Sequence, residues 1–145
     1  MIKLFVAMAF LCTTNFVPSP WLTNLDKAEQ KAKTEHKLIL LNFSGSDWCI
    51  PCMKLKADIF DSDAFQDYAK DKLVLVNADF PRKKKDQLSK EQQQQNDALA
   101  AKYNPEGRFP FTILLDSNGN KLKVWDGYYS QGPDNFVDEI TAVKQ

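Results

Sequence analysis

Runs of apolar residues alternate with amphipathic, charged segments along most of the chain. The near-continuous apolar runs at 37–43 and 72–80 have the length of strands that are covered on both faces of a sheet. Two more strands are predicted within 109–127, where Asn118 and Gly119 favour a two-residue hairpin because both residues tolerate positive φ. These last two strands should therefore be antiparallel.

Helical patterns separate the predicted strands. A short first strand at Trp21-Leu22 precedes them, and the residues "TNLD" at 23–26 have the spacing of a helix cap. Apolar residues then recur at helical spacing in five segments, whose approximate bounds are 23–36, 49–59, 61–71, 88–103 and 133–145. The order of elements predicts an α/β domain with helices on both faces of a central mixed sheet.

The first residues differ from the rest of the chain. Lys3 is followed by the apolar run 4–12, which is shorter than the roughly 20 residues that a membrane-spanning helix needs. We interpret 1–17 as a signal peptide and 18–145 as a single domain, which predicts an extracytoplasmic and periplasmic location. The alternative is that the apolar run forms an N-terminal strand. Removal of the signal would also remove Cys12.

The length and the charge balance indicate the number of domains and exclude some classes of partner. The 145 residues suffice for one domain with its own core, and the 19 basic residues balance the 19 acidic ones. No overall field draws such a chain to nucleic acid or to an anionic membrane, so we predict no nucleic-acid partner and no stable membrane insertion after signal cleavage.

The most informative motif is Cys49-Ile50-Pro51-Cys52, which follows a predicted buried strand and opens a helix. A cysteine at a helix start faces unpaired backbone N–H groups and the positive end of the helix dipole, which both stabilise a thiolate. Such settings lower the pKa of a cysteine from about 8.5 to roughly 3.5 to 7.5. Cys52 lies one turn further along the same helix face, close enough to resolve a mixed disulfide. The motif therefore predicts a redox-active dithiol that needs no cofactor.

Two other roles for the pair remain open from the residues alone. A structural zinc site needs four nitrogen or sulfur donors, and the mature chain offers only Cys49, Cys52 and the single histidine, His36. We expect His36 to act as a cation at the end of a helix rather than as a ligand. A disulfide between positions so close in sequence removes little entropy from the unfolded chain, so a purely structural bridge is also disfavoured.

The segments "LILLNFSGSDWCIPCMKLK", "LVLVNADF", "RFPFTILLD" and "DSNGNKL", with the final amphipathic helix, resemble the thioredoxin superfamily. They are most similar to the thioredoxin-like proteins exported by bacteria. The resemblance covers almost the whole chain after Thr23. It implies a thioredoxin fold and thiol-disulfide exchange with protein substrates.

The same resemblance implies roles for individual residues. Cys49 would be the exposed nucleophile and Cys52 the buried resolver, with Trp48 flanking the site. Pro110 would be a cis proline that faces the disulfide and leaves the neighbouring backbone free to pair with an extended substrate segment. Phe109, just before it, would line the same groove. Ile50 and Pro51, which lie between the cysteines, are expected to contact substrate and to influence the reduction potential.

Two departures from the thioredoxin pattern are visible. Thioredoxins carry a buried aspartate in the strand before the motif, whereas this chain has Asn42, which cannot accept a proton from the resolving cysteine. The loop "SGSD" before Trp48 is also one residue longer. Within this loop Asp47 could oppose thiolate formation or could simply be a solvated residue.

We therefore predict a thiol-disulfide oxidoreductase that acts on protein disulfides, with a leaning toward reduction because Cys-x-Pro-Cys is similar to the reducing thioredoxins. Its partners would be protein substrates with thiols or disulfides and a separate redox partner. A non-enzymatic binding or chaperone module with a passive bridge is the first alternative, and metal carriage is the second. An ordinary cysteine pKa near 8.5 would favour the passive module.

Overall fold

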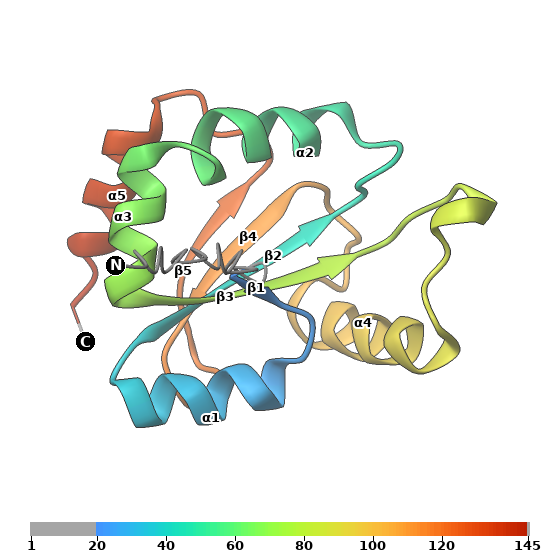
Figure 1. The fold of residues 1–145 in the computed structure, drawn as a ribbon, viewed down its shortest axis with the longest axis horizontal. Coiled ribbons are helices and arrows are strands. Elements are labelled where there is room, and N and C mark those ends of the chain that lie inside the picture. The colour runs from blue at the N-terminus through green and yellow to red at the C-terminus, as the bar shows by residue number, and fades with distance from the viewer. Residues whose placement is uncertain (1–19, 145) are drawn as a thin grey trace, which may run out of the picture.

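The computed structural model describes residues 20–144, so the proposed signal peptide at 1–17 lies outside the described residues. The elements run in the order β1 (Trp21–Leu22), α1 (Leu25–Glu35), β2 (Leu38–Ser44), α2 (Ile50–Leu55), η1 (Lys56–Phe60), α3 (Asp63–Lys72), β3 (Leu73–Asp79), η2 (Lys84–Asp86), α4 (Lys90–Tyr103), β4 (Phe111–Leu115), β5 (Lys121–Asp126) and α5 (Pro133–Thr141) (Figure 1).

The five strands form one sheet in the order β1-β3-β2-β4-β5. Strand β3 runs parallel to both β1 and β2, whereas β4 is antiparallel to β2 and β5 is antiparallel to β4. The predicted mixed sheet and the antiparallel final strands are confirmed. Because β2 and β3 are parallel neighbours, the loops that follow them leave the same edge of the sheet.

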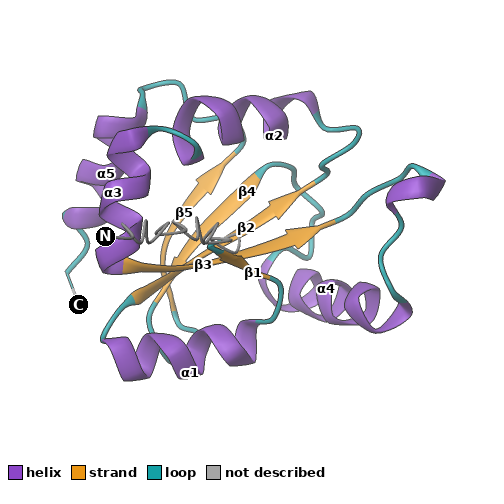
Figure 2. Ribbon diagram, viewed as in Figure 1, coloured by secondary structure: helices purple, strands orange, loops and turns teal. Residues whose placement is uncertain are grey.

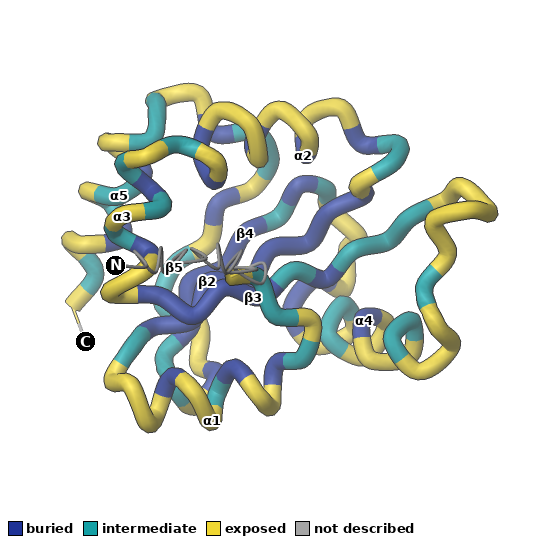
Figure 3. Tube along the Cα trace, viewed as in Figure 1, coloured by how far each residue is buried: buried dark blue, intermediate teal, exposed yellow. Residues whose placement is uncertain are grey.

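Helices cover both faces of the sheet, as predicted from the order of elements. Figure 2 shows α2, α3 and α5 on one face and α1 and α4 on the other. Each face has its own cluster of buried apolar side chains, one centred on Phe65 and Phe136 and the other on Phe43 and Tyr103. Strand β2 lies between the two clusters and is buried along its whole length (Figure 3). This explains its uninterrupted apolar sequence.

The hairpin between β4 and β5 differs from the predicted two-residue turn. The N–H of Gly119 donates to the carbonyl of Asp116 at 3.1 Å, and the N–H of Asp116 donates to the carbonyl of Asn120 at 3.0 Å. Gly119 has φ of 80°, whereas among the described residues only His36 is a non-glycine with positive φ. Asn118 thus keeps negative φ. The five residues 116–120 connect the strands, and the Asp116 carboxylate fixes this loop by accepting from the N–H groups of Asn118 and Asn120.

Helix boundaries differ from the sequence-based prediction by a few residues. Asn24 caps α1, one residue after Thr23, because its side chain accepts from the N–H of Lys27 at 2.9 Å. The helix predicted at 49–59 changes from α-helical to π-helical geometry after Leu55. Local hydrophobic spacing places helices well but does not fix their last turn.

Candidate active site

The two cysteines lie where β2 passes into α2. Cys49 is the N-cap of α2 and Pro51 occupies its first turn, where a missing N–H costs nothing. Cys49 and Cys52 form a disulfide with their Cα atoms 5.3 Å apart. The pair therefore follows the carboxyl end of the central, buried strand β2 and opens a helix, as predicted.

A hydrogen bond connects the two cysteines besides the disulfide. The backbone N–H of Cys52 points at Sγ of Cys49, with 3.3 Å between nitrogen and sulfur. This N–H belongs to the first turn of the helix, so it has no carbonyl partner within the helix. When the disulfide is reduced, the same donor can stabilise negative charge on the Cys49 sulfur. The geometry thus places a hydrogen-bond donor at the Cys49 sulfur, where the motif predicts that a thiolate is stabilised.

The predicted difference in exposure between the cysteines is wrong for this oxidised state. Cys49 is 4% exposed and Cys52 is 6% exposed, so both side chains are buried. In the disulfide the Cys49 sulfur is turned toward Cys52 and its N–H, which leaves only a small edge facing solvent. Ile50, the residue that follows Cys49, is 75% exposed and marks the open side of the motif.

An aromatic cluster flanks the cysteines. The ring centroid of Trp48 lies 5.4 Å from that of Phe109, and the ring centroid of Phe80 lies 5.5 Å from that of Phe109. The indole N–H of Trp48 donates to the carbonyl of Phe80 at 2.7 Å. The peptide bond between Phe109 and Pro110 is cis, as the family resemblance implied. Trp48 and Phe109, which are far apart in sequence, are thus brought together beside the motif.

Two carboxylates, absent from the predicted site, hold the loops around it. Asp79 at the end of β3 accepts a hydrogen bond from the N–H of Ser46 at 2.8 Å and another from its hydroxyl. Asp47 accepts in turn from the backbone N–H groups of Arg82 at 2.9 Å and Lys83 at 2.7 Å. Each loop therefore anchors the other. Asp47 is thus a half-buried carboxylate engaged with backbone N–H groups rather than a simple solvated residue.

This anchoring also changes the acidity of Asp47. Partial removal from water opposes ionisation, but the backbone hydrogen bonds from Arg82 and Lys83 outweigh it and hold the pKa of the Asp47 carboxyl below its ordinary value. The carboxylate is therefore charged at neutral pH and remains engaged with the loop after β3. Neither Asp47 nor Asp79 carries a sequence signal for this role, because their partners are more than thirty residues away.

A cavity of about 340 Å³ lies behind Cys52, between α2 and the sheet. Asn42 and Asn77, opposite each other on β2 and β3, line it together with Cys52. The Asn42 amide donates to Oδ1 of Asn77 at 2.9 Å, and its carbonyl oxygen accepts from the Thr112 hydroxyl at 3.0 Å. Asn42, which stands where thioredoxins carry an aspartate, therefore has hydrogen-bond partners for both its amide N–H and its carbonyl oxygen. The network supplies no carboxyl group at this position.

The metal-carrier alternative does not fit the placement of its third ligand. His36 follows α1 and precedes β2, whereas the cysteines follow the other end of this seven-residue strand, roughly 20 Å away. Among residues 20–144 no group of three or more potential ligands is arranged to hold a metal. His36 instead ends α1, where its backbone N–H donates to the carbonyl of Ala32.

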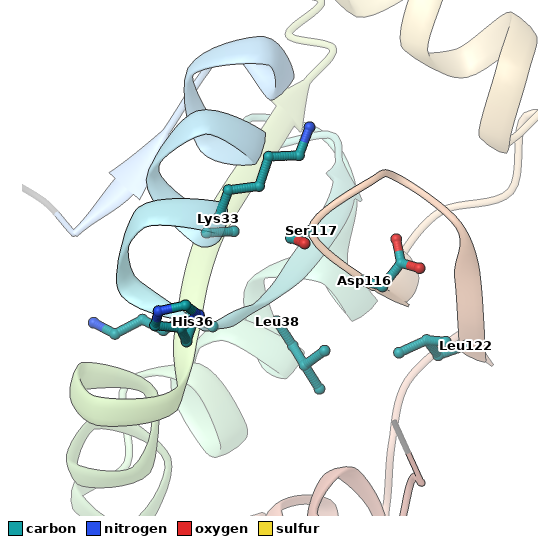
Figure 4. A pocket seen from close by; sticks show the side chains of 8 residues that line it. Lys33, His36, Leu38, Asp116, Ser117 and Leu122 are labelled. Atoms are coloured by element: carbon teal, nitrogen blue, oxygen red, sulfur yellow. The ribbon is translucent and has the colours of Figure 1, made fainter.

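A second cavity, of about 310 Å³, lies beside His36 at this far end of the sheet (Figure 4). Lys33 and His36 at the end of α1 face Asp116 and Ser117 of the β4–β5 hairpin across it. It contains neither of the paired cysteines. The reactive pair and its flanking aromatic side chains therefore belong to the opposite end of the molecule.

A mixed sheet with helices on both faces, and a cysteine pair that opens a helix after a central buried strand, define the thiol-disulfide oxidoreductases of thioredoxin fold. The family model for the thioredoxin-like domain matches residues 25–144. The chain therefore belongs to the thioredoxin-like family, and the fold predicted from the sequence is confirmed.

Two curated relatives come from Chlamydia pneumoniae. The disulfide bond reductase DsbH is 38% identical over 116 residues, which cover 80% of this chain and 68% of the relative. The thioredoxin-related protein DsbJ is 29% identical over 123 residues, which cover 85% of this chain but only 34% of that relative. This chain thus spans about a third of the second relative.

Solved structures agree with this fold. A structure of DsbH oxidoreductase superimposes with a TM-score of 0.76 at 34% identity, covering 84% of this chain and 81% of the other. The oxidised C-terminal domain of DsbD from Neisseria meningitidis gives a TM-score of 0.56 at 17% identity, with 82% and 91% of the chains covered. At this low identity the DsbD likeness bears on the fold alone.

Proposed function

We propose that this protein is a disulfide reductase in which Cys49 attacks protein disulfides and Cys52 resolves the mixed disulfide. The single observation that carries the proposal is the N-cap position of Cys49, whose sulfur accepts the hydrogen bond from the N–H of Cys52. The same placement makes Cys49 the better nucleophile, because negative charge on its sulfur is stabilised before the reaction begins.

The reaction proceeds in two exchanges. The Cys49 thiolate attacks one sulfur of the substrate disulfide, and the other substrate sulfur leaves as a thiolate that takes up a proton. Cys52 then loses its proton and attacks Cys49, which releases the second substrate thiolate and forms the Cys49–Cys52 disulfide. Two electrons pass to the substrate; of the two protons that complete its thiols, Cys52 supplies one and solvent the other. The disulfide seen in the structure is the oxidised product of this cycle, which a dithiol donor must reduce again.

The residues around the pair are proposed to bind the substrate. Ile50 and Pro51 are exposed beside Cys49, while Trp48 and Phe109 form an aromatic wall next to it. Pro110, which follows Phe109 and is buried, is proposed to leave the neighbouring backbone free to pair with the substrate. An extended segment of a substrate protein that packs on these apolar surfaces would present its disulfide to Cys49.

The direction of electron flow follows from the relatives rather than from the geometry. The relative that is 38% identical is named a disulfide bond reductase, which supports reduction. We therefore expect a reduction potential closer to the roughly −270 mV of reducing thioredoxins than to the roughly −120 mV of strong oxidants.

We also propose that the protein is exported from the cytoplasm. The signal peptide proposed at 1–17 would place the domain outside the cytoplasm, in a bacterial periplasm, where a reductase depends on a separate redox partner. Within residues 20–144 no helix has the length and apolar character needed to cross a membrane. Determining the N-terminus of the protein recovered from the periplasmic fraction tests the cleavage.

The proposed roles are tested by an insulin reduction assay with single cysteine variants. Cys49→Ser should abolish turnover, because no attacking sulfur remains. Cys52→Ser should instead accumulate covalent mixed disulfides through Cys49, which non-reducing gels and mass spectrometry detect. If both variants reduce insulin at near wild-type rates, the cysteines form a passive bridge and the proposal fails.

A further inference from the structure

A run of four basic residues lies beside the proposed active site. Arg82, Lys83, Lys84 and Lys85, here called the basic loop, follow β3 and lead through η2, and all four are exposed. Figure 1 shows this segment projecting beyond the sheet on the side where α2 begins. None of the ion pairs among residues 20–144 involves the basic loop. In a chain with a net charge of zero, these four cations give the loop a local positive charge, and the Asp47 carboxylate is the acidic group that interacts with it, through Lys83.

The basic loop is fixed against the residues that precede the disulfide. The guanidinium carbon of Arg82 lies 3.6 Å from the centroid of the Trp48 ring, which is the distance of a stacked cation–π contact. The Asp47 carboxylate accepts from the backbone N–H groups of Arg82 and Lys83. The start of the basic loop is thus held in place by contacts with Asp47 and Trp48. These two residues immediately precede Cys49 in the sequence.

This position restricts what the basic loop can recognise. A ligand bound at Arg82 lies beside Trp48, the residue that precedes Cys49. The chemistry of Cys49 requires a thiol or a disulfide, which a protein substrate provides and a nucleic acid or a lipid does not. The chain also lacks the overall positive charge that would attract nucleic acid or an anionic membrane. Charge complementarity therefore favours an acidic segment of the substrate protein.

We propose that the basic loop selects protein substrates whose target disulfide is flanked by acidic residues. This inference rests on the proposed reductase function and adds a specificity to it. The apolar surfaces of Ile50 and Phe109 hold the segment around the disulfide, and the basic loop attracts carboxylates next to that segment. Because exposed charges act mainly on encounter, the selection affects kcat/KM and weakens as salt screens the charges.

The test compares two peptides that contain the same internal disulfide and differ only in flanking residues, which are Asp and Glu in one and Lys in the other. The variant Lys83→Gln/Lys84→Gln/Lys85→Gln removes three charges and leaves the Arg82 contact with Trp48 intact. A matched control, Lys33→Gln/Lys70→Gln/Lys72→Gln, removes three exposed charges from the ends of α1 and α3, at the far edge of the sheet.

We expect the wild-type protein at low salt to prefer the acidic peptide, with a ratio of the two kcat/KM values of about ten or more. The basic-loop variant should lower this ratio about tenfold, and 0.3 M salt should lower it similarly in the wild type. The control variant should keep the wild-type ratio. Equal kcat/KM values for the two peptides, or a preference that survives in the basic-loop variant, would overturn the inference.

A binding experiment separates this inference from the reductase proposal. The same peptides with both cysteines replaced by serine are titrated against the wild-type protein and the two variants. Loss of the preference for the acidic peptide in the basic-loop variant alone supports the inference even if the protein reduces neither disulfide peptide. Binding of anionic phosphatidylglycerol vesicles through the basic loop, without any preference between the peptides, would overturn it in favour of a membrane surface.

Discussion

Gly45 lies directly against the indole of Trp48, so that a Cβ atom added to Gly45 would be 2.3 Å from Cε2 of the ring. The carbonyl of Gly45 also accepts from the N–H of Cys49 at 2.9 Å. The absence of a side chain at this position thus lets the loop fold tightly under Trp48. The position of the aromatic wall beside the cysteines depends on this close approach.

The first prediction concerns this contact. Gly45→Ala should push the Trp48 ring away from Phe109, which we expect to destabilise the protein by about 1 to 3 kcal/mol and to lower kcat/KM for insulin reduction. Urea unfolding and steady-state kinetics measure the two effects. Gly107→Ala is the matched control, because a Cβ there meets nothing within 4 Å although its φ of 65° makes the backbone less favourable. It should cost stability without changing kcat/KM.

A second prediction concerns proton transfer at Cys52. Asn42 lines the cavity behind Cys52 but cannot accept a proton, so Asn42→Asp should accelerate resolution of the mixed disulfide at neutral pH by about tenfold to a hundredfold. Stopped-flow measurement of substrate release across pH 5 to 9 detects the change and a new titration in the profile. Asn42→Ala, which breaks the same hydrogen bonds without adding an acid, is the control. An unchanged rate in Asn42→Asp would show that the proton leaves by another route.

The third prediction tests the anchoring of the basic loop. Asp47→Ala removes the acceptor for the N–H groups of Arg82 and Lys83, so hydrogen exchange of these two amides should become at least about tenfold faster. Because the pKa of Asp47 lies below its ordinary value of 3.8, the wild-type anchor is intact above pH 3.8 and weakens only as the pH falls below it. Asp97→Ala, whose carboxylate accepts from Gln93 on the same helix, should leave both amides protected.

The fourth prediction concerns acid stability through Glu139. Its carboxylate accepts hydrogen bonds from Lys123 at 3.0 Å, from the indole N–H of Trp125 at 2.9 Å and from the Tyr129 hydroxyl at 2.9 Å. The Lys123 and Trp125 donors lower the pKa of Glu139 below its ordinary 4.5 despite desolvation. Burial, followed by the contact with Glu139, raises the pKa of Tyr129 to about 12, so the hydroxyl keeps its proton.

A lowered carboxyl pKa means that the unfolded chain binds protons more readily than the folded protein as the pH falls. The contribution of Glu139 to stability is therefore complete above pH 4.5 and is lost as the pH drops through the lower folded value. Glu139→Gln should cost about 1 to 2 kcal/mol at pH 7 and much less at pH 3. Urea unfolding at both pH values measures this, with Asp138→Asn as the exposed control. Equal costs at pH 7 and pH 3 would contradict the assignment.

Most of the fold could be predicted from local patterns. Strands β2 and β3 were recognisable because continuous apolar runs of this length are typical of strands buried on both faces. The cysteine motif was recognisable because a helix start and a spacing of three residues are both local properties. The hairpin type was predicted wrongly, since the Asp116 carboxylate, rather than the Asn118-Gly119 pair alone, determines how the loop closes.

The residues that surround the motif were only partly predictable. Trp48, Phe109 and Pro110 were expected near the cysteines from family resemblance, and the structure places Trp48 against Phe109. The roles of Asp47 and Asp79 could not be predicted, because each binds residues that follow the neighbouring strand and lie more than thirty positions away in sequence. Knowledge of the register between β2 and β3 would have been needed to bring these loops together.

The sequence by itself determined the chemistry of this protein: two cysteines one helical turn apart, opening a helix after a buried strand. It could do so because thiolate stabilisation by the first helical N–H groups acts within a few residues. Only the tertiary structure decided what surrounds the Cys49–Cys52 pair, namely the cavity behind Cys52, the aromatic wall and the basic loop held by Asp47. Those features depend on the parallel pairing of β2 with β3, which brings distant segments to the same edge of the sheet.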